Sequence, residues 1–448
     1  MFNTISGWLT NREVRAKLFL TLVLLAVYRL GFSIVLAVVN QGVLAETLSK
    51  KGAEGGVGGA IALLSMLSAS NVGMMTIFGL GIMPYISASI IFQLLSTVYP
   101  PLEALQKEGD VGRRKINEYT RYCTVVICLV QSFVWLNVSM RGGEGGLVWP
   151  GFGGFYLQFI CAVTMTTGSV LLMWIGEQID EFGLGNGISL LIMAGILARV
   201  PEVGLSIVRP AIEQGMMVGS QVGVDRLILL LLLFIVVVGG VVLVTQAQRR
   251  VPLHSARHAR SLASAGQPQF LPLKVNQSGV MPVIFASSLM VFPVLLLKQC
   301  VLATAFAPVL HRFFLVVDGV VSDSSGFVYN ILFVALVYFF CYFWSAVSFN
   351  PNEVANNLRE HGVFVPGYRP GGRTASYLER VISRLNFLGA TFLALVAMIP
   401  VLVMNFVGVD YLVASFFGGT SLLICVSVAI DLVQKIEGHA GAGKSRAV

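Results

Sequence analysis

Long apolar runs alternate with short polar segments along the chain, and their lengths predict ten membrane-spanning helices. A helix needs about 20 mostly apolar residues to cross the hydrocarbon core of a bilayer. Runs close to this length recur from the first residues to the last, and polar or glycine-rich segments separate them. We therefore expect an all-α polytopic membrane protein. The predicted spans are residues 18–39, 74–97, 122–140, 154–175, 186–203, 227–246, 278–297, 327–348, 386–406 and 412–433.

The composition agrees with this interpretation. Of the 448 residues, 56% are hydrophobic and 12% are charged, whereas soluble domains carry about 25% charged residues. The six cysteines stand singly, without the spacing of a zinc site or a disulfide framework. The sequence therefore predicts one large membrane domain with no metal site.

The distribution of Lys and Arg predicts the orientation, because cytoplasmic segments are enriched in positive charge. With the N-terminus in the cytoplasm, the inside segments hold 21 of the 30 basic residues and the outside segments hold eight. Both termini are then cytoplasmic, which agrees with an even number of spans. The inside segment 176–185 is an exception, because it carries Glu177, Asp180 and Glu181 and no basic residue.

Two weak spans contain an internal repeat. The nine residues from Gly81 to Ser89 align without gaps to the nine from Gly279 to Ser287, with six identities at a separation of 198 residues. The ten spans divide into two sets, spans 1–5 and spans 6–10, and each copy of the repeat lies at the start of the second span of its set. Because five is odd, the sets have opposite topology, a pattern typical of transport proteins.

The repeat divides the chain into an N-terminal half (1–205), a C-terminal half (206–434) and a flexible basic cytoplasmic tail (435–448). Polar groups in the two weak spans are better satisfied against another helix or a wet cavity than against lipid. We expect these spans to form two sides of a seam that opens. The polar residues assigned to it are Ser87, Gln93, Ser287 and Ser288.

The outer segment 57–72 is too short and too rich in small residues to span a bilayer. It directly precedes the second span. It is either an amphipathic turn on the surface or a re-entrant segment that lines a cavity.

The predicted spans contain few ionisable residues that could serve catalysis or ion coupling. Arg29 and Asp431 are the main ionisable residues within the spans, and all five histidines lie in loops or tails. Proton- or sodium-coupled carriers usually keep carboxylates or histidines at mid-membrane. We therefore expect no enzyme and no cofactor, and we keep an inverted-repeat secondary transporter as the alternative to a channel.

The tail contains a literal match to the phosphate-loop pattern, from Gly438 to Ser445. A phosphate loop works between a strand and the N-terminus of a helix. Here it follows a predicted transmembrane helix, and three residues come after it. We expect no nucleotide binding.

Two long basic segments, 247–277 and 349–385, face the cytoplasm. They contain Arg249, Arg250 and Arg369, and Gly and Pro bracket Arg369 in a pattern that predicts a turn. Such loops set the topology, but their length exceeds that need and favours docking of an acidic or RNA-bearing partner.

Nearly the whole chain resembles the SecY family, the central subunits of bacterial protein-conducting translocons. Several long motifs carry the resemblance, in the family's order. They are Leu80–Ile91, Lys107–Ile116, Gly176–Ile179 with Gly185–Ser189, Leu271–Asn276, Phe349–Glu353, Pro366–Gly371 and Gly418–Ile424.

The resemblance implies an hourglass channel between the two halves, closed at its waist by a ring of aliphatic side chains. Such a collar excludes water and ions when closed and is not selective for one substrate sequence. Matched motif by motif, all six ring positions are isoleucine here. They are Ile82, Ile86, Ile192, Ile196, Ile284 and Ile424.

The resemblance also assigns roles to the other features. Segment 57–72 corresponds to the family's plug, and the two weak spans correspond to its lateral gate, together with the third and eighth spans. Arg249, Arg250 and Arg369 correspond to the docking surface for the ribosome or the motor ATPase SecA. The plug residues are Ile61, Leu64, Met66 and Leu67.

The implied setting is the bacterial cytoplasmic membrane. The implied partners are SecE-like and SecG-like subunits, unfolded preproteins with their signal sequences, and membrane lipid. Two segments depart from the family's pattern. Residues 34–40 lack the usual proline-rich turn, and residues 65–70 lack the usual Phe-Ser-Gly-Gly of the plug.

Overall fold

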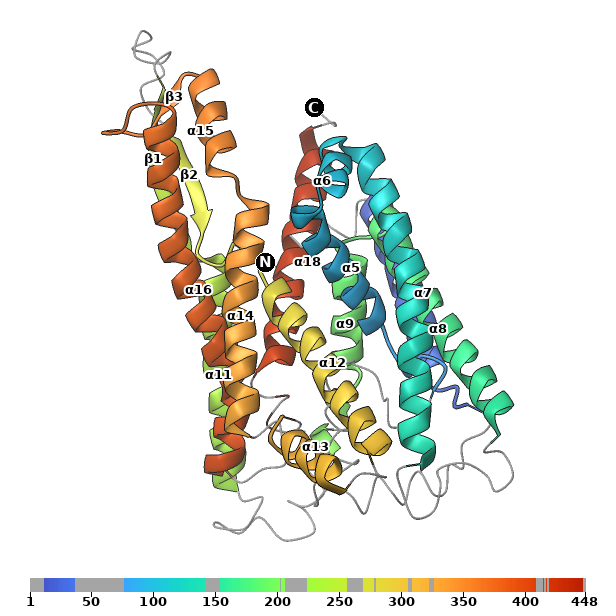
Figure 1. The fold of residues 1–448 in the computed structure, drawn as a ribbon. Helices are drawn as coiled ribbons and strands as arrows, with labels where there is room; N and C mark the ends of the chain where they lie inside the picture. Colours follow the sequence, from blue (N-terminus) through green and yellow to red (C-terminus); the bar gives the residue numbers. More distant parts are fainter. Residues whose placement is uncertain are drawn as a thin grey trace. The chain divides into compact units, whose positions relative to one another are not determined.

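The computed structural model describes residues 12–36, 76–141, 154–201, 203–205, 224–255, 269–277, 279–304, 308–321, 326–407, 414, 416 and 419–445. Within these ranges, a helix occupies each of the ten predicted spans (Figure 1). The helices are α2 (Arg12–Gly31), α5 (Met83–Val98), α7 (Asp110–Arg141), α8 (Phe155–Phe182), α9 (Gly187–Leu197), α11 (Val224–Gln246), α12 (Met281–Ala303), α14 (Phe327–Ser348), α16 (Gly372–Val407) and α18 (Thr420–Ser445).

Five of the described helices are long and apolar enough to cross a membrane. These five segments are Val111–Asn137, Phe155–Phe182, Ile228–Gln246, Phe327–Glu360 and Gly372–Met404. Shorter apolar stretches form α5, α9 and the first part of α12. The fold is thus a mostly α-helical polytopic membrane fold.

Helix ends differ from the predicted spans where a helix continues into polar sequence. Helix α8 runs to Phe182, so most of the predicted loop 176–185 is helical. Helix α16 begins at Gly372, inside the predicted loop 349–385. Apolar runs mark only the part of a helix that lies in lipid, whereas backbone hydrogen bonds let the helix continue beyond it.

The chain packs as two compact units. Unit 1 comprises residues 1–215, 287–331 and 428–448, and unit 2 comprises residues 216–286 and 332–427. The boundary passes through α12, α14 and α18. These units are defined by packing and the predicted halves by topology, so the division of the chain at residue 205 stays a prediction.

Unit 1 is built around α7 and α8, which lie side by side with α5 against them (Figure 1). A short helix, α6 (Pro100–Lys107), joins α5 to α7. Another, α13 (Pro308–Val321), follows α12. Buried side chains such as Trp135 and Met165 form the core between α7 and α8.

Unit 2 carries a small three-stranded sheet next to its long helices. The strands are β1 (Gln248–Ser255), β2 (Gln269–Lys274) and β3 (Val363–Phe364), in the order β2-β1-β3, and both pairings are antiparallel. Helix α15 (Pro351–Glu360) leads into β3. The two predicted cytoplasmic loops therefore fold together.

Candidate functional site

The first turns of α5 and α12 share one local structure. Gly81 has φ 60° and Gly279 has φ 62°, in the left-handed region that favours glycine. Pro84 and Pro282 follow three residues later, near the start of each helix. Proline fits there because its missing N–H would have no partner within the helix. The sequence repeat therefore corresponds to a repeat of backbone structure.

The segment that leads into α5 is held between α2 and α8 within unit 1. A backbone bridge joins Val35, just after α2, to Thr76. On the other side, a Cβ atom added at Gly168 of α8 would lie 2.2 Å from the carbonyl oxygen of Ile77. Only glycine permits this approach, so backbone contacts fix the position of the first turn of α5.

Four of the isoleucines assigned to the pore ring belong to unit 1. Ile82 precedes α5 and Ile86 lies four residues further on, and Ile192 and Ile196 have the same spacing on α9. Residues four apart share one face of a helix. None of the four side chains is more than 8% exposed.

The other two isoleucines belong to unit 2. Ile284 lies in the first turn of α12, five residues after Gly279, just as Ile86 follows Gly81. Ile424 lies near the start of α18. Both side chains are buried. The arrangement of all six isoleucines as one ring stays a prediction.

The polar residues assigned to the lateral gate are buried or half-buried. Ser87, Ser287 and Ser288 are buried, and Ser288 Oγ donates to the sulfur of Met83 at 3.8 Å. This contact joins α12 to the first turn of α5 within unit 1. Among the described side chains, Gln93 Oε1 is a buried acceptor without a hydrogen-bond partner.

A second link between predicted gate helices involves Gln299 of α12, for which the sequence predicted no role. Its Nε2 donates to the carbonyl oxygen of Val134 on α7 at 3.3 Å. Glutamine inside an apolar helix is a signal that could have found it, because such groups are usually satisfied by a neighbouring helix.

The plug lies outside the residues that the structure describes. Segment 57–72 and its residues Ile61, Leu64, Met66 and Leu67 are therefore not placed, and neither are residues 65–70 and 37–40 of the two departing segments.

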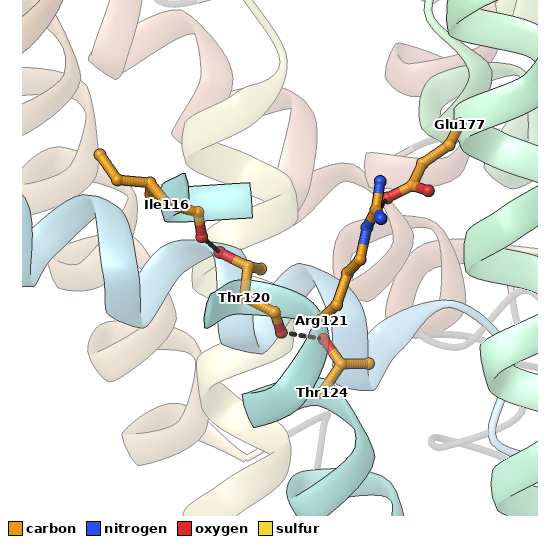
Figure 2. A network of polar contacts seen from close by, with 5 residues as sticks. All are labelled: Ile116, Thr120, Arg121, Thr124 and Glu177. Atoms are coloured by element: carbon orange, nitrogen blue, oxygen red, sulfur yellow. Dashed lines mark hydrogen bonds and ion pairs between the residues drawn. The ribbon is translucent and has the colours of Figure 1, made fainter. Parts of the chain in front are cut away.

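An ion pair joins α7 to α8. It involves Glu177, one of the acidic residues that made the predicted cytoplasmic segment 176–185 an exception to the positive-charge rule. Arg121 Nε donates to Glu177 Oε1 at 2.8 Å (Figure 2). The two side chains are 49% and 25% exposed. Figure 2 also shows the hydroxyl of Thr120 bonded to the carbonyl of Ile116, four residues earlier. Glu177 thus contributes a structural contact rather than an unpaired negative charge.

Asp180 has a second structural contact at the same end of α8. Its Oδ1 accepts a hydrogen bond from the backbone N–H of Gly187 at 2.8 Å, and Lys435 of α18 attracts it electrostatically. Gly187 is the first residue of α9, so the carboxylate satisfies an N–H that has no partner within the helix. Two of the three carboxylates in the predicted loop, those of Glu177 and Asp180, thus make structural contacts with other segments.

Arg249, Arg250 and Arg369 of unit 2 belong to one folded element, here called the basic module: β1, β2, α15, β3, the turn after β3 and the start of α16. A shared hydrophobic core holds it, and Val251, Leu273 and Leu378 are almost fully buried there. Arg249 and Arg250 lie on β1, opposite Leu273 and Pro272 of β2. Both arginines are exposed.

Arg369 lies in the predicted turn between β3 and α16. Gly367 and Gly371, on either side of it, have φ 84° and φ 104°. The hydroxyl of Thr374 donates to the carbonyl of Arg369 at 3.0 Å, and the rings of Tyr368 and Tyr377 lie 4.3 Å apart. The backbone is therefore fixed while the guanidinium is exposed.

The fold and these features define a polytopic α-helical membrane protein with paired glycine–proline helix starts, buried aliphatic side chains beside them and an exposed basic module. The SecY family model matches residues 76–433 of the chain. The protein translocase subunit SecY of Aquifex aeolicus is 39% identical over 431 residues, which cover 95% of this chain and 94% of that protein. The Escherichia coli K12 protein of the same name is 38% identical over 428 residues, covering 95% and 91%. The chain belongs to the SecY family.

Solved structures agree with this assignment of the fold. One described as the structure of a protein conducting channel has a TM-score of 0.63 at 20% identity, covering 94% of this chain and 91% of that one. Sec61 in a canine ribosome-channel complex has a TM-score of 0.60 at 20% identity, with the same coverage. The fold predicted from the sequence is confirmed.

Proposed function

We propose that this chain is a passive protein-conducting channel of the bacterial cytoplasmic membrane. It translocates secretory proteins and releases hydrophobic segments into lipid, and it catalyses no reaction. The observation that carries the proposal is the burial of the isoleucine at each of the six predicted ring positions, three of which lie at the paired helix starts. Apolar constrictions block water and ions when closed, and they suit substrates of any sequence.

Membership of a family whose curated members are named translocase subunits supports this function. The secondary transporter is not favoured, because a transporter needs polar groups that bind one substrate, whereas all six matched positions are isoleucine. In the channel, segment 57–72 acts as the plug, and α5 and α12 act as the lateral gate.

The basic module is the proposed docking surface for a driving partner, either SecA or the ribosome. Its arginines are exposed on a fixed backbone, and arginine suits phosphate and carboxylate partners. Solved complexes of related fold with ribosomes, canine Sec61 and yeast Ssh1, support a ribosome partner. SecE-like and SecG-like subunits complete the proposed assembly.

The experiment is translocation of a secretory precursor into vesicles that contain the reconstituted complex. We expect Arg369→Glu to lower partner-driven translocation several-fold, because it reverses the charge of an exposed side chain without removing a buried contact. Arg384→Glu is the matched control, an exposed arginine further along α16. Equal translocation by the two variants would contradict docking at the turn. Absence of translocation by the unmodified complex would contradict the channel itself.

A further inference from the structure

Helix α13 connects two membrane-spanning helices but cannot itself cross a bilayer. Its 14 residues extend about 21 Å at 1.5 Å per residue, less than the roughly 30 Å of the hydrocarbon core. Figure 1 shows it lying crosswise to α7 and α8, at the end of unit 1 opposite α6. It therefore lies at a membrane surface, which the predicted orientation makes the non-cytoplasmic one.

One side of α13 is an exposed apolar stripe. Val309, Phe313, Val316 and Val320, here called the α13 stripe, follow one another at intervals of four, three and four residues, which places them on one face. All four are exposed, Phe313 by 63% and Val316 by 65%. This face is therefore uncovered in the folded chain.

A different side of α13 is fixed to the end of α12. His311 Nδ1 lies 3.1 Å from the carbonyl oxygen of Val301. A carbonyl oxygen can only accept, so the ring nitrogen donates. Asp318, seven residues after His311, is on the same side and is half-buried. The contact with α12 therefore sets the rotation of α13 about its own axis.

The helices before and after α13 in the chain also carry exposed apolar side chains. Leu296 of α12 is 64% exposed and Phe327 of α14 is 78% exposed. Helix α14 is one of the helices long and apolar enough to span a membrane, so we expect its exposed apolar side chains to lie against acyl chains. Arg312 is exposed beside the stripe, where a long cationic side chain can reach phosphate groups.

We infer that α13 is an interfacial helix whose stripe inserts into the lipid of the non-cytoplasmic leaflet. A helix with one apolar and one polar face binds a membrane surface in this way. Because His311 joins α13 to α12, the lipid surface holds the outer end of a helix assigned to the lateral gate.

The test is photo-crosslinking in native membranes with benzoylphenylalanine placed in the full chain at Phe313 or Val316. Phe314 is the matched control, since it lies on the same helix, on the side of His311 and away from the stripe, and is half-buried. We expect phospholipid adducts, identified by mass spectrometry, to be several-fold more abundant at the two stripe positions. Equal lipid adducts at Phe314, no lipid adducts at the stripe, or adducts to another protein would each overturn the inference.

A second measurement tests the role of His311. In the His311→Ala background, we expect lipid adducts at Val316 to fall and those at Phe314 to rise, because the helix is no longer held in one rotation. His311→Asn keeps a side-chain donor and should preserve the original pattern. An unchanged pattern in His311→Ala would show that His311 does not orient the helix.

Discussion

Helices α5 and α12 begin alike and then differ. Each follows a glycine of positive φ and has a proline near its start. Helix α5 ends at Val98 and packs within unit 1, whereas α12 continues through Pro293 and passes from unit 2 into unit 1. The start of each helix is thus determined locally by its own residues, while its later course depends on the helices it meets.

The largest expected effect comes from asparagine at the two predicted ring positions in the first turns of α5 and α12. Ile86→Asn and Ile284→Asn each place a polar group in a predicted apolar constriction, which favours water there. We expect ion conductance of the closed channel in planar bilayers to rise clearly in both variants, because a polar group favours water in the constriction. Leu171→Asn, at an exposed position on α8, should leave conductance unchanged. A rise in only one ring variant would mean that the two starts are not equivalent.

Alanine at the paired glycines should have the next largest effect. Gly279→Ala introduces no clash, since a Cβ added there meets nothing within 4 Å, so only backbone strain remains. A left-handed conformation costs an L-residue about 1–2 kcal/mol, and Gly81→Ala bears the same strain. Both substitutions should therefore lower the free energy of unfolding measured in denaturant by about this amount. Gly319→Ala in α13 should cause no loss in the free energy of unfolding. If Gly279→Ala also caused no loss, the role of positive φ would be contradicted.

The Arg121–Glu177 pair should contribute less, and only on the α5 side of the comparison. It joins the two helices on which α5 packs. Because Arg121 is half-exposed, a double-mutant cycle with Arg121→Ala and Glu177→Ala should give a coupling of about 0.2–1 kcal/mol. The coupling should decrease at high salt. A coupling that is independent of salt would indicate packing rather than charge.

The smallest effect concerns the contact between the two helices. Ser288→Ala removes a donor to the sulfur of Met83, and a thioether is a weak acceptor. We expect a change of about 0.5 kcal/mol in the free energy of unfolding. Met83→Leu keeps the volume and removes the acceptor, so the double variant should lose no more than either single one. Additive losses would show that the two atoms do not interact.

The sequence was informative wherever a local pattern determines the structure. Apolar run lengths predicted a helix at each of the ten spans, and the repeated Gly-x-Met-Pro predicted the shared start of α5 and α12. Gly and Pro around Arg369 predicted its turn. Each of these features depends on a few consecutive residues.

Features that depend on distant partners could not be predicted. The acidic segment 176–185 contradicted the charge rule until Arg121 and Lys435 were found near its carboxylates. The contact of Gln299 with α7 and the shared core of the basic module likewise join segments far apart in the chain. Their residues carry no local mark of the partner they meet.

The central claim is that a translocating polypeptide passes the buried isoleucines at the paired helix starts. Its most direct test is photo-crosslinking of a stalled secretory precursor to benzoylphenylalanine at Ile86 and Ile284, with Leu171 of α8 as the control position. Adducts between precursor and channel at both isoleucines, and none at Leu171, are the predicted result. Translocation that proceeds without adducts at either isoleucine would contradict the account.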